Sequence, residues 1–254
     1  MGHQLRVAAC QISSGPDPGR NLQTARVAID RAAAAGARIA VLPEAAMACF
    51  GTPLVDIAEP LDGPYAQGIR DAAAKHGITV AAGMFEPADD GRVHNTVLLT
   101  GPDGEWAYRK IHLFDAFGSR ESETVAPGSE LVTGTVAGIT IGLATCYDVR
   151  FADQFSALGR AGAQLILLPA SWGDGPGKAE QWDLLVRARA MDAQAWLLAC
   201  DQAWVPTRGK LALGIGRSAL CDPLGGVRAQ LGHTADILVT DIDLDAVTDT
   251  RQRV

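Results

Sequence analysis

The chain alternates short apolar segments with segments of helical character, and this alternation limits the folds open to it more than any other feature. Apolar runs such as "LRVAACQI" (5–12) and "AQLILLPAS" (163–171) have the length of strands. They are continuous rather than alternating, which indicates strands buried on both faces. Helices are predicted between the strands, at 21–36, 65–77 and 179–194. This order predicts an α/β protein whose sheets are covered by helices.

Local signals set the predicted ends of these elements. In the segment 21–36 the side chain of Asn21 is expected to cap the helix start, and Gly36 is expected to end it. The predicted helix 65–77 likewise ends on a glycine. A Pro-Asp-Gly turn separates strand 94–101 from segment 104–114, as in a β-hairpin.

The chain shows no linker, repeat or low-complexity tract, so we expect one domain over residues 1–254. The formal net charge is −7 and no run of Lys and Arg occurs, which argues against a nucleic-acid partner. Residues 173–180, "GDGPGKAE", are predicted to form a loop over a site.

Cysteine usage points to a reducing compartment. The five cysteines are odd in number and none are spaced as C-x-x-C. Cys10 and Cys200 fall inside apolar strands, where we expect them to pack. The N-terminus lacks a signal-peptide pattern and no stretch of 18 apolar residues occurs, so we expect a cytoplasmic protein with no membrane partner.

Three chemically useful residues come directly after apolar strands. Glu44 follows "IAVLP", Lys110 follows "EWAYR" and Cys146 follows "TIGLAT". Sites in such sheets form beyond the carboxyl ends of strands. A thiol can attack an electrophilic carbon when a carboxylate takes its proton and a cation stabilises the oxyanion. From spacing alone, packing for the cysteine and surface positions for the other two remain open.

A resemblance to a known family favours the chemical interpretation. "VLPEAAM", "YRKIHLFD" and "GLATCYDVRF" resemble, in order, the three motifs of the carbon–nitrogen hydrolase (nitrilase) superfamily. Nearly the whole chain is similar. The resemblance implies a four-layer α-β-β-α sandwich, no metal or cofactor, and a homodimer. Members usually continue beyond a stretch like "DIDLDAV" into a tail that crosses to the partner subunit, and the end of this sequence at Val254 leaves such tail contacts in doubt.

The same resemblance implies roles for individual residues. Glu44 would be the general base, Lys110 the electrostatic stabiliser and Cys146 the nucleophile. The backbone N–H of Tyr147 would complete the oxyanion hole. Glu121, in "ESETVAPG", matches a second glutamate that many members place beside the lysine; the alternative is a loop salt bridge with Arg120 or Arg109.

Further residues are implied as scaffold or substrate contacts. Ser171 and Trp172, in "LLPASW", are candidate substrate-binding residues. Asp148, Arg150 and Arg189 match positions that we interpret mainly as buried ion-pair scaffolding, and Arg150 is also a candidate for substrate binding. His112 is expected to brace its motif through hydrogen bonds. Arg208, Lys210 and Arg217 could also meet a substrate carboxylate.

Cys-Tyr-Asp resembles the amidase branch, which includes ω-amidases and deaminated-glutathione amidases, more than the Cys-Trp-Glu of true nitrilases. The expected reaction converts a small amide, with carboxylated amides among the candidates, to acid and ammonia through a cysteine thioester. N-carbamoyl amidase and nitrilase activities remain alternatives. Two other classes also remain open: a metal-dependent phosphoesterase using Glu44, His112 and Asp148, and an inactive binding protein.

Overall fold

A computed structural model describes residues 4–206 and 214–254 of the chain. Twelve strands form two six-stranded sheets within these residues. The first sheet contains β1 (Gln4–Gln11), β2 (Ile39–Val41), β3 (Thr79–Pro87), β4 (Val93–Gly101), β5 (Gly104–Arg109) and β12 (Asp236–Asp243). The second contains β6 (Thr133–Val136), β7 (Ile139–Leu143), β8 (Leu165–Ala170), β9 (Trp196–Asp201), β10 (Ala219–Cys221) and β11 (Val227–Gln230).

Both sheets follow one plan. The strand orders are β12-β1-β2-β3-β4-β5 and β11-β10-β9-β8-β7-β6. In each sheet three strands run parallel, β1-β2-β3 and β7-β8-β9. The strands next to them, β12, β4, β6 and β10, pair antiparallel to them, and β5 and β11 pair antiparallel to β4 and β10. The parallel strands are the ones predicted from continuous apolar runs, because each is covered on both faces.

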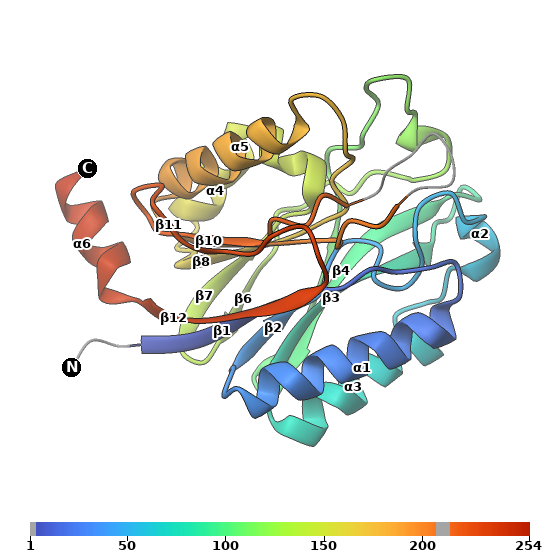
Figure 1. The fold of residues 1–254 in the computed structure, drawn as a ribbon, viewed down its shortest axis with the longest axis horizontal. Coiled ribbons are helices and arrows are strands. Elements are labelled where there is room, and N and C mark those ends of the chain that lie inside the picture. Colours follow the sequence, from blue (N-terminus) through green and yellow to red (C-terminus); the bar gives the residue numbers. More distant parts are fainter. Residues whose placement is uncertain (1–3, 207–213) are drawn as a thin grey trace.

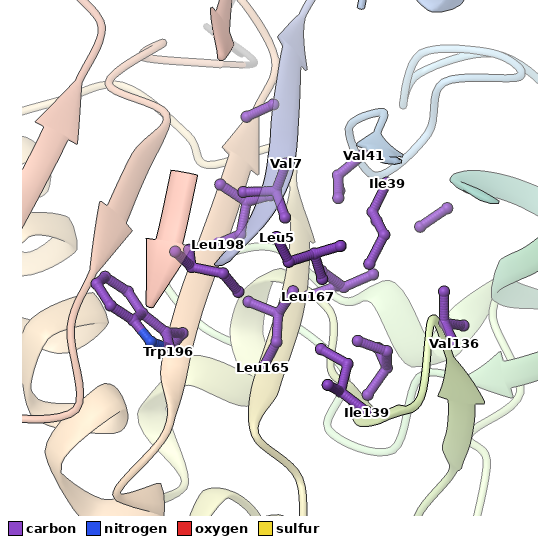
Figure 2. Packing of buried hydrophobic residues seen from close by; sticks show 14 of the residues in the cluster. Leu5, Val7, Ile39, Val41, Val136, Ile139, Leu165, Leu167, Trp196 and Leu198 are labelled. Carbon is purple, nitrogen blue, oxygen red and sulfur yellow. The ribbon is translucent and has the colours of Figure 1, made fainter. Parts of the chain in front are cut away.

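The two faces of each central strand pack against different layers. Leu165 and Leu167 belong to the apolar cluster between the sheets, whereas Ile166 and Leu168 face the helices of the second sheet. This is the two-residue period of a strand. Figure 2 shows the between-sheet cluster, in which side chains of β1 and β2 meet those of β8 and β9.

The described residues contain six α-helices, four of which form the two outer layers. The helices are α1 (Pro18–Ala34), α2 (Leu54–Ile57), α3 (Pro64–His76), α4 (Ala152–Arg160), α5 (Lys178–Ala193) and α6 (Asp245–Arg253). Helices α1 and α3 cover the first sheet, and α4 and α5 cover the second (Figure 1). The arrangement is the predicted α-β-β-α sandwich. None of the helices in the described residues is both long enough and apolar enough to cross a membrane.

The start of α1 differs from the prediction. The helix begins at Pro18, and its cap is Asp17, whose carboxylate accepts hydrogen bonds from the N–H groups of Gly19 (2.9 Å) and Arg20 (3.2 Å). Asp17 is the cap because Pro18, which follows it, has a backbone φ already suited to the first helical turn. Asn21 instead turns inward and donates to the Met47 carbonyl at 2.8 Å.

Other predicted ends are confirmed, and three short elements, α2, β6 and α6, were not predicted. Helix α3 ends at Gly77, whose φ of 62° is left-handed, and the hairpin of β4 and β5 forms across residues 101–104. Helix α6 was not predicted because its sequence, "DAVTDTRQR", has no apolar stripe. It is attached by buried Val247 and by Arg251, which donates to the Ala163 carbonyl at 2.7 Å.

Candidate active site

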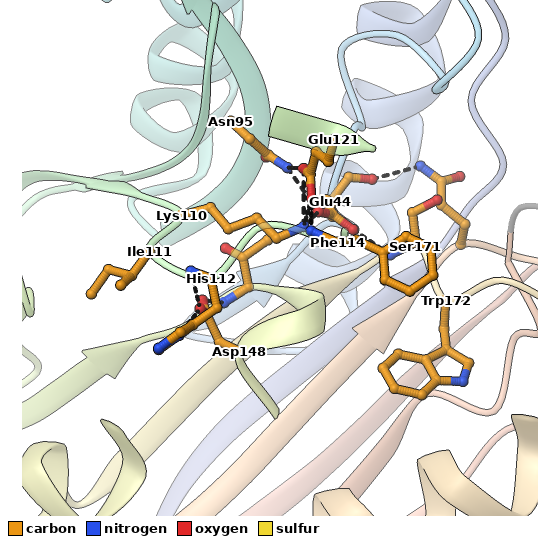
Figure 3. Close-up of polar contacts among 12 residues, drawn as sticks. Glu44, Asn95, Lys110, Ile111, His112, Phe114, Glu121, Asp148, Ser171 and Trp172 are labelled. Carbon is orange, nitrogen blue, oxygen red and sulfur yellow. Dashed lines mark hydrogen bonds and ion pairs between the residues drawn. The ribbon is translucent and has the colours of Figure 1, made fainter. Parts of the chain in front are cut away.

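Glu44, Lys110 and Glu121 meet at the ends of the strands, as predicted for the first two. Glu44 follows β2, Lys110 follows β5, and Glu121 opens a short 3₁₀ helix, η1 (Glu121–Glu123). The Lys110 ammonium donates to Glu44 Oε1 at 2.8 Å and to Glu121 Oε2 at 2.9 Å (Figure 3). The glutamate–lysine contact matches the expectation for Glu121 and replaces the alternative of a salt bridge with Arg120 or Arg109.

The carboxylates of Glu44 and Glu121 are buried and share the single ammonium of Lys110, so they need further hydrogen-bond donors to offset the loss of water. Asn95 on β4 supplies an amide N–H to Glu44 Oε1 (2.8 Å) and to Glu121 Oε1 (3.2 Å). Backbone donors complete the set: the N–H of Ser171 reaches Glu44 at 2.9 Å, and that of Phe114 reaches Glu121 at 2.6 Å. These donors satisfy the buried carboxylate oxygens and fix the positions of both side chains.

Asn95 is the residue that sequence reasoning missed. The available signal was an asparagine within a predicted strand, where this residue type is depleted. Its side chain is buried and bridges the two glutamates (Figure 3).

Lys110 is held as a cation by its neighbours. Only 2% of the residue is exposed. Burial by itself would lower the pKa of the Lys110 ammonium, but the Glu121 and Glu44 carboxylates oppose burial and raise this pKa well above its usual value. Lys110 therefore provides a permanent positive charge at the site.

Cys146 occupies a strained turn beside this cluster. It opens a second 3₁₀ helix, η2 (Cys146–Arg150), just after β7, and its φ is 44°, a left-handed value that is rare outside glycine. Burial raises the pKa of the Cys146 thiol well above its usual value, and the nearby Glu44 charge raises it further. Lys110 and the N–H of Ser171 act in the opposite direction. The resting side chain is therefore a thiol with a carboxylate close by.

Asp148 ties the cysteine turn to the lysine strand. Its Oδ2 accepts from the Thr145 N–H (2.8 Å) and the Tyr108 hydroxyl (2.6 Å). Its Oδ1 accepts from the His112 N–H at 3.0 Å and contacts His112 Nδ1 at 2.9 Å. The His112 ring also stacks on Phe151. The expected bracing by His112 is thus present, with Asp148 as its partner.

The expected ion-pair scaffolding is confirmed for Arg189, while Asp148 contacts the ring of His112 and the expectation is wrong for Arg150, which bonds to the neutral amide of Gln181. Asp148 pairs with His112, and Arg189 pairs with Asp192 at 2.8 Å.

A cavity of about 220 Å³ lies over the buried cluster. Its polar lining includes Glu44, Lys110, Glu121 and Cys146, and the predicted Tyr147, Ser171 and Trp172 also line it. Its remaining lining residues are Phe50, Gly51, Phe114, Ser119, Arg120, Thr124, Gly173 and Lys178. The segment predicted to form a loop over a site, residues 173–180, contributes Gly173 and Lys178. The volume suits a small ligand.

Arg150 and Arg217, two of the residues predicted to reach a substrate, do not line this cavity. The guanidinium of Arg150 lies over the rings of Tyr147 (5.6 Å from the ring centre) and Trp172 (5.1 Å). Its polar partner is Gln181 at 2.5 Å. Arg217 is paired with Asp183. Arg208 and Lys210 lie outside the described residues.

The ligand set of the phosphoesterase alternative is not assembled. His112 and Asp148 bond to each other, while Glu44 is bonded to Lys110, Asn95 and Ser171. Across residues 4–206 and 214–254, no three His, Cys, Asp or Glu side chains are grouped so that they could hold a metal ion.

Glycine at position 83 allows the Glu44 backbone to sit directly on β3. A Cβ added to Gly83 would lie 2.7 Å from the Pro43 carbonyl oxygen and 2.9 Å from Glu44 Cα. The loop that follows β2 is therefore pressed against the neighbouring strand, which fixes the position of the Glu44 side chain.

A four-layer α/β sandwich with a buried cysteine, lysine and two glutamates around a cavity describes an enzyme of the hydrolase class. Residues 6–252 match the family model for carbon-nitrogen hydrolase. The chain belongs to the carbon-nitrogen hydrolase family, and relatives named as amidases place it in the amidase branch of the nitrilase superfamily.

Relatives match almost the full length. A hydrolase of Mycobacterium tuberculosis is 48% identical, covering 98% of this chain and 93% of the relative. The omega-amidase NIT2 of Homo sapiens is 32% identical, covering 98% and 92%. Among solved structures, Nit3 of Saccharomyces cerevisiae, a member of branch 10 of the superfamily, has a TM-score of 0.87 at 28% identity and covers 99% of this chain and 94% of that one.

Proposed function

We propose that this protein is an amidase that converts a small amide to a carboxylic acid and ammonia through a thioester on Cys146. One observation supports this most strongly: Glu44 and Lys110, 2.8 Å apart, line the same small cavity as the buried thiol. The set provides a base, a cation and a nucleophile. The relatives named omega-amidase support an amide as the substrate.

In the proposed acylation, Cys146 Sγ attacks the amide carbon while the thiol proton moves to Glu44. The raised pKa of the thiol makes this transfer necessary, because little thiolate exists at neutral pH. The oxyanion that forms accepts hydrogen bonds from the Lys110 ammonium and the backbone N–H of Tyr147. Tyr147 belongs to the first turn of η2, where N–H groups lack partners within the helix.

The tetrahedral intermediate then loses its amine. The C–N bond breaks, the proton held by Glu44 passes to the departing nitrogen, and ammonia leaves behind a thioester. In deacylation, Glu44 takes a proton from water, the resulting hydroxide attacks the thioester carbon, and the C–S bond breaks. The proton returns from Glu44 to sulfur, which restores the thiol and releases the acid.

The second glutamate, Glu121, is proposed to hold Lys110 in place and charged. It accepts from Lys110 with both oxygens, at 3.1 and 2.9 Å, and is itself fixed by the Phe114 N–H. Glu44 is thereby left with one oxygen on Lys110 and Asn95 and the other on the Ser171 N–H. This division lets Glu44 exchange a proton while Lys110 keeps its charge.

The proposal is tested by ammonia release from four substrate classes: aliphatic amides, carboxylated amides, N-carbamoyl amino acids and aliphatic nitriles. Amide hydrolysis with an acyl adduct on Cys146, seen by intact mass after acid quench, is the expected result. Adduct and turnover should both disappear in Cys146→Ala. Turnover of only nitriles or N-carbamoyl compounds would contradict the amidase assignment while leaving the three residues in place.

Two further expectations belong to the same proposal. Activity should persist in EDTA, because the chain's own residues provide the nucleophile, base and oxyanion stabilisation; loss on chelation that zinc or manganese restores would contradict it. The homodimer expected from the family resemblance remains a prediction, which light scattering of the purified protein can check.

A further inference from the structure

Asp201 is a buried carboxylate beside the site that the proposed reaction does not use. It is the last residue of β9, and none of its surface is exposed. The ion pairs formed within residues 4–206 and 214–254 do not include it. A carboxylate taken out of water without a counter-ion is costly unless hydrogen bonds replace the water. A neutral residue would avoid this cost, so the presence of an acid here needs an explanation.

Backbone N–H groups take the place of a counter-ion. Asp201 Oδ1 accepts from the Trp172 N–H at 2.7 Å, and Oδ2 accepts from the Ile215 N–H at 2.8 Å. The Trp172 carbonyl in turn accepts from the Gly214 N–H at 3.0 Å. One carboxylate therefore joins the segment after β8 to the segment before β10. The segment after β8 is part of the cavity wall, because Ser171 and Trp172 both line the cavity.

The backbone group next to the one that Asp201 holds belongs to the proposed base. The Ser171 N–H donates to Glu44 Oε2 at 2.9 Å, as Figure 3 shows, whereas the N–H of Trp172, one residue further on, donates to Asp201. Two buried carboxylates are thus held by two consecutive N–H groups. Only the two backbone dihedrals of Ser171 separate these groups, so a displacement of one is passed to the other.

Gln202 holds the backbone of Glu44 from the same strand end. Its side-chain amide donates to the Glu44 carbonyl at 2.9 Å and to the Ala45 carbonyl at 3.4 Å. Ala45 has a left-handed φ of 55°, which is uncommon for a residue with a side chain, so this turn depends on its neighbours for support. The end of β9 therefore contacts the Glu44 backbone through Gln202 and the Glu44 side chain through the segment that Asp201 holds.

The charge of Asp201 also acts on Glu44. Burial raises the pKa of Asp201 well above its usual value, backbone N–H groups oppose this rise, and the Glu44 charge adds to it. Repulsion between like charges is mutual, so ionised Asp201 makes Glu44 a stronger acceptor of the thiol proton. The other ionisable groups that face Glu44 are the Lys110 ammonium, which acts in the opposite direction, Glu121, which is bonded to Lys110, and the Cys146 thiol.

We propose that Asp201 is a positioning residue of the active site: through Trp172 it holds the Ser171 N–H on Glu44, and its negative charge strengthens Glu44 as a base. The inference rests on the proposed function, in which Glu44 takes the thiol proton. Asp201 does not line the cavity and so does not touch the substrate. Its effect therefore lies in kcat and in the pH dependence of the reaction rather than in KM.

The pH dependence of ammonia release by Asp201→Asn and by a matched control, Asp222→Asn, tests this role. Asp222 is also a buried aspartate, whose Oδ1 accepts from the N–H groups of Leu224 and Gly226 at 2.9 Å. In Asp201→Asn the new NH₂ group faces an N–H that cannot accept, so kcat should fall about tenfold while KM changes less than about threefold. The acid limb of kcat/KM should move about half a pH unit or more to lower pH, because Glu44 no longer faces a second negative charge. Asp222→Asn should leave this limb unchanged.

Hydrogen exchange provides a readout that does not depend on turnover. In Asp201→Asn, with folding checked by circular dichroism, the N–H groups of Ser171 and Trp172 should exchange at least about tenfold faster than in the wild type. Asp222→Asn should leave their exchange unchanged. If the wild type hydrolyses no amide, the proposed function fails, and the exchange rates still decide whether Asp201 positions this segment.

Asp201→Ser is a second neutral variant, since a hydroxyl places no NH₂ group against the backbone and can accept from one N–H. A wild-type acid limb in the folded variants, or wild-type exchange of the Ser171 N–H in them, would overturn the inference. Failure of both variants to fold would also overturn it, because Asp201 would then serve the fold alone.

Discussion

The substitution Asp148→Asn should destabilise the fold because it leaves a buried backbone donor without an acceptor. In the wild type each carboxylate oxygen accepts two hydrogen bonds, from the N–H and ring of His112 on one side, and from Thr145 and Tyr108 on the other. An asparagine offers one accepting oxygen. Its NH₂ group must then face either the Thr145 N–H or the His112 N–H, and neither of these can accept.

The magnitude follows from these contacts. A buried unpaired N–H costs about 1–3 kcal/mol, and the remaining bonds lose the strength that the negative charge gave them. Together we expect a loss of about 3 kcal/mol from the free energy of unfolding, which is a large share of the roughly 5–15 kcal/mol typical of a folded protein. The Tyr108 hydroxyl already accepts from the Ile111 N–H and the Gln154 amide, so the asparagine NH₂ should face His112, whose ring can accept, and the loss is limited to the His112 N–H.

Urea unfolding of wild type, Asp148→Asn and the control Asp249→Asn measures this difference. Asp249 is exposed on α6, so its change should stay within about 0.5 kcal/mol. The ammonia-release rate of folded Asp148→Asn should also fall more than about tenfold, because the Thr145 N–H directly precedes the cysteine turn and small displacements of reacting groups slow chemistry strongly. A loss below about 1 kcal/mol would show that Asp148 does not brace the turn.

Three other outcomes are expected. In the ammonia assay, Glu44→Gln should lower kcat by about 10²–10⁴-fold and Lys110→Met by about 10²–10³-fold. The Lys110→Arg variant should also lose activity, because a planar guanidinium does not replace a compact ammonium. Near-normal activity in Lys110→Arg would show that a positive charge alone suffices. Because the pKa of the Cys146 thiol is raised, its thiolate fraction should keep growing at high pH. The rate of Cys146 modification by iodoacetamide should therefore still increase above about pH 9 rather than level off near pH 7. Mass spectrometry measures this modification, with Cys146→Ala as the control. Gly83→Ala should lower both the urea midpoint and kcat, since its Cβ would approach the Pro43 oxygen to 2.7 Å; a neutral result would mean that the loop moves freely.

The sequence predicted the parts of the site that depend on strand ends. Glu44 and Cys146 both follow parallel strands, so their position at one edge of the sandwich follows from the direction of the chain. Lys110 ends the hairpin strand that a Pro-Asp-Gly turn already indicated. Local pattern placed these residues at strand ends, and the resemblance to the carbon–nitrogen hydrolase family supplied their expected roles.

Other parts depend on which segments become neighbours, which no local pattern contains. Asn95 matters because β4 places it between two glutamates that are 51 and 26 positions away in sequence. Asp201 has significance only once Trp172 and Ile215 are seen around it. The partners of Asp148 could not be named from sequence for the same reason: the fold brings His112 and Tyr108 to it from another segment.

The left-handed backbone conformation of Cys146 lowers the stability of the fold at the residue that the proposed activity requires. A side chain at φ 44° destabilises the native state, and glycine would adopt this conformation without that penalty. Cys146→Gly should therefore unfold at a higher urea concentration than Cys146→Ala, although glycine also gains freedom in the unfolded chain. Selection for thermal robustness alone would favour losing the thiol at this turn. The reactive residue persists at position 146 only as long as turnover is required, and a library sorted for folding without assaying hydrolysis should accumulate glycine there.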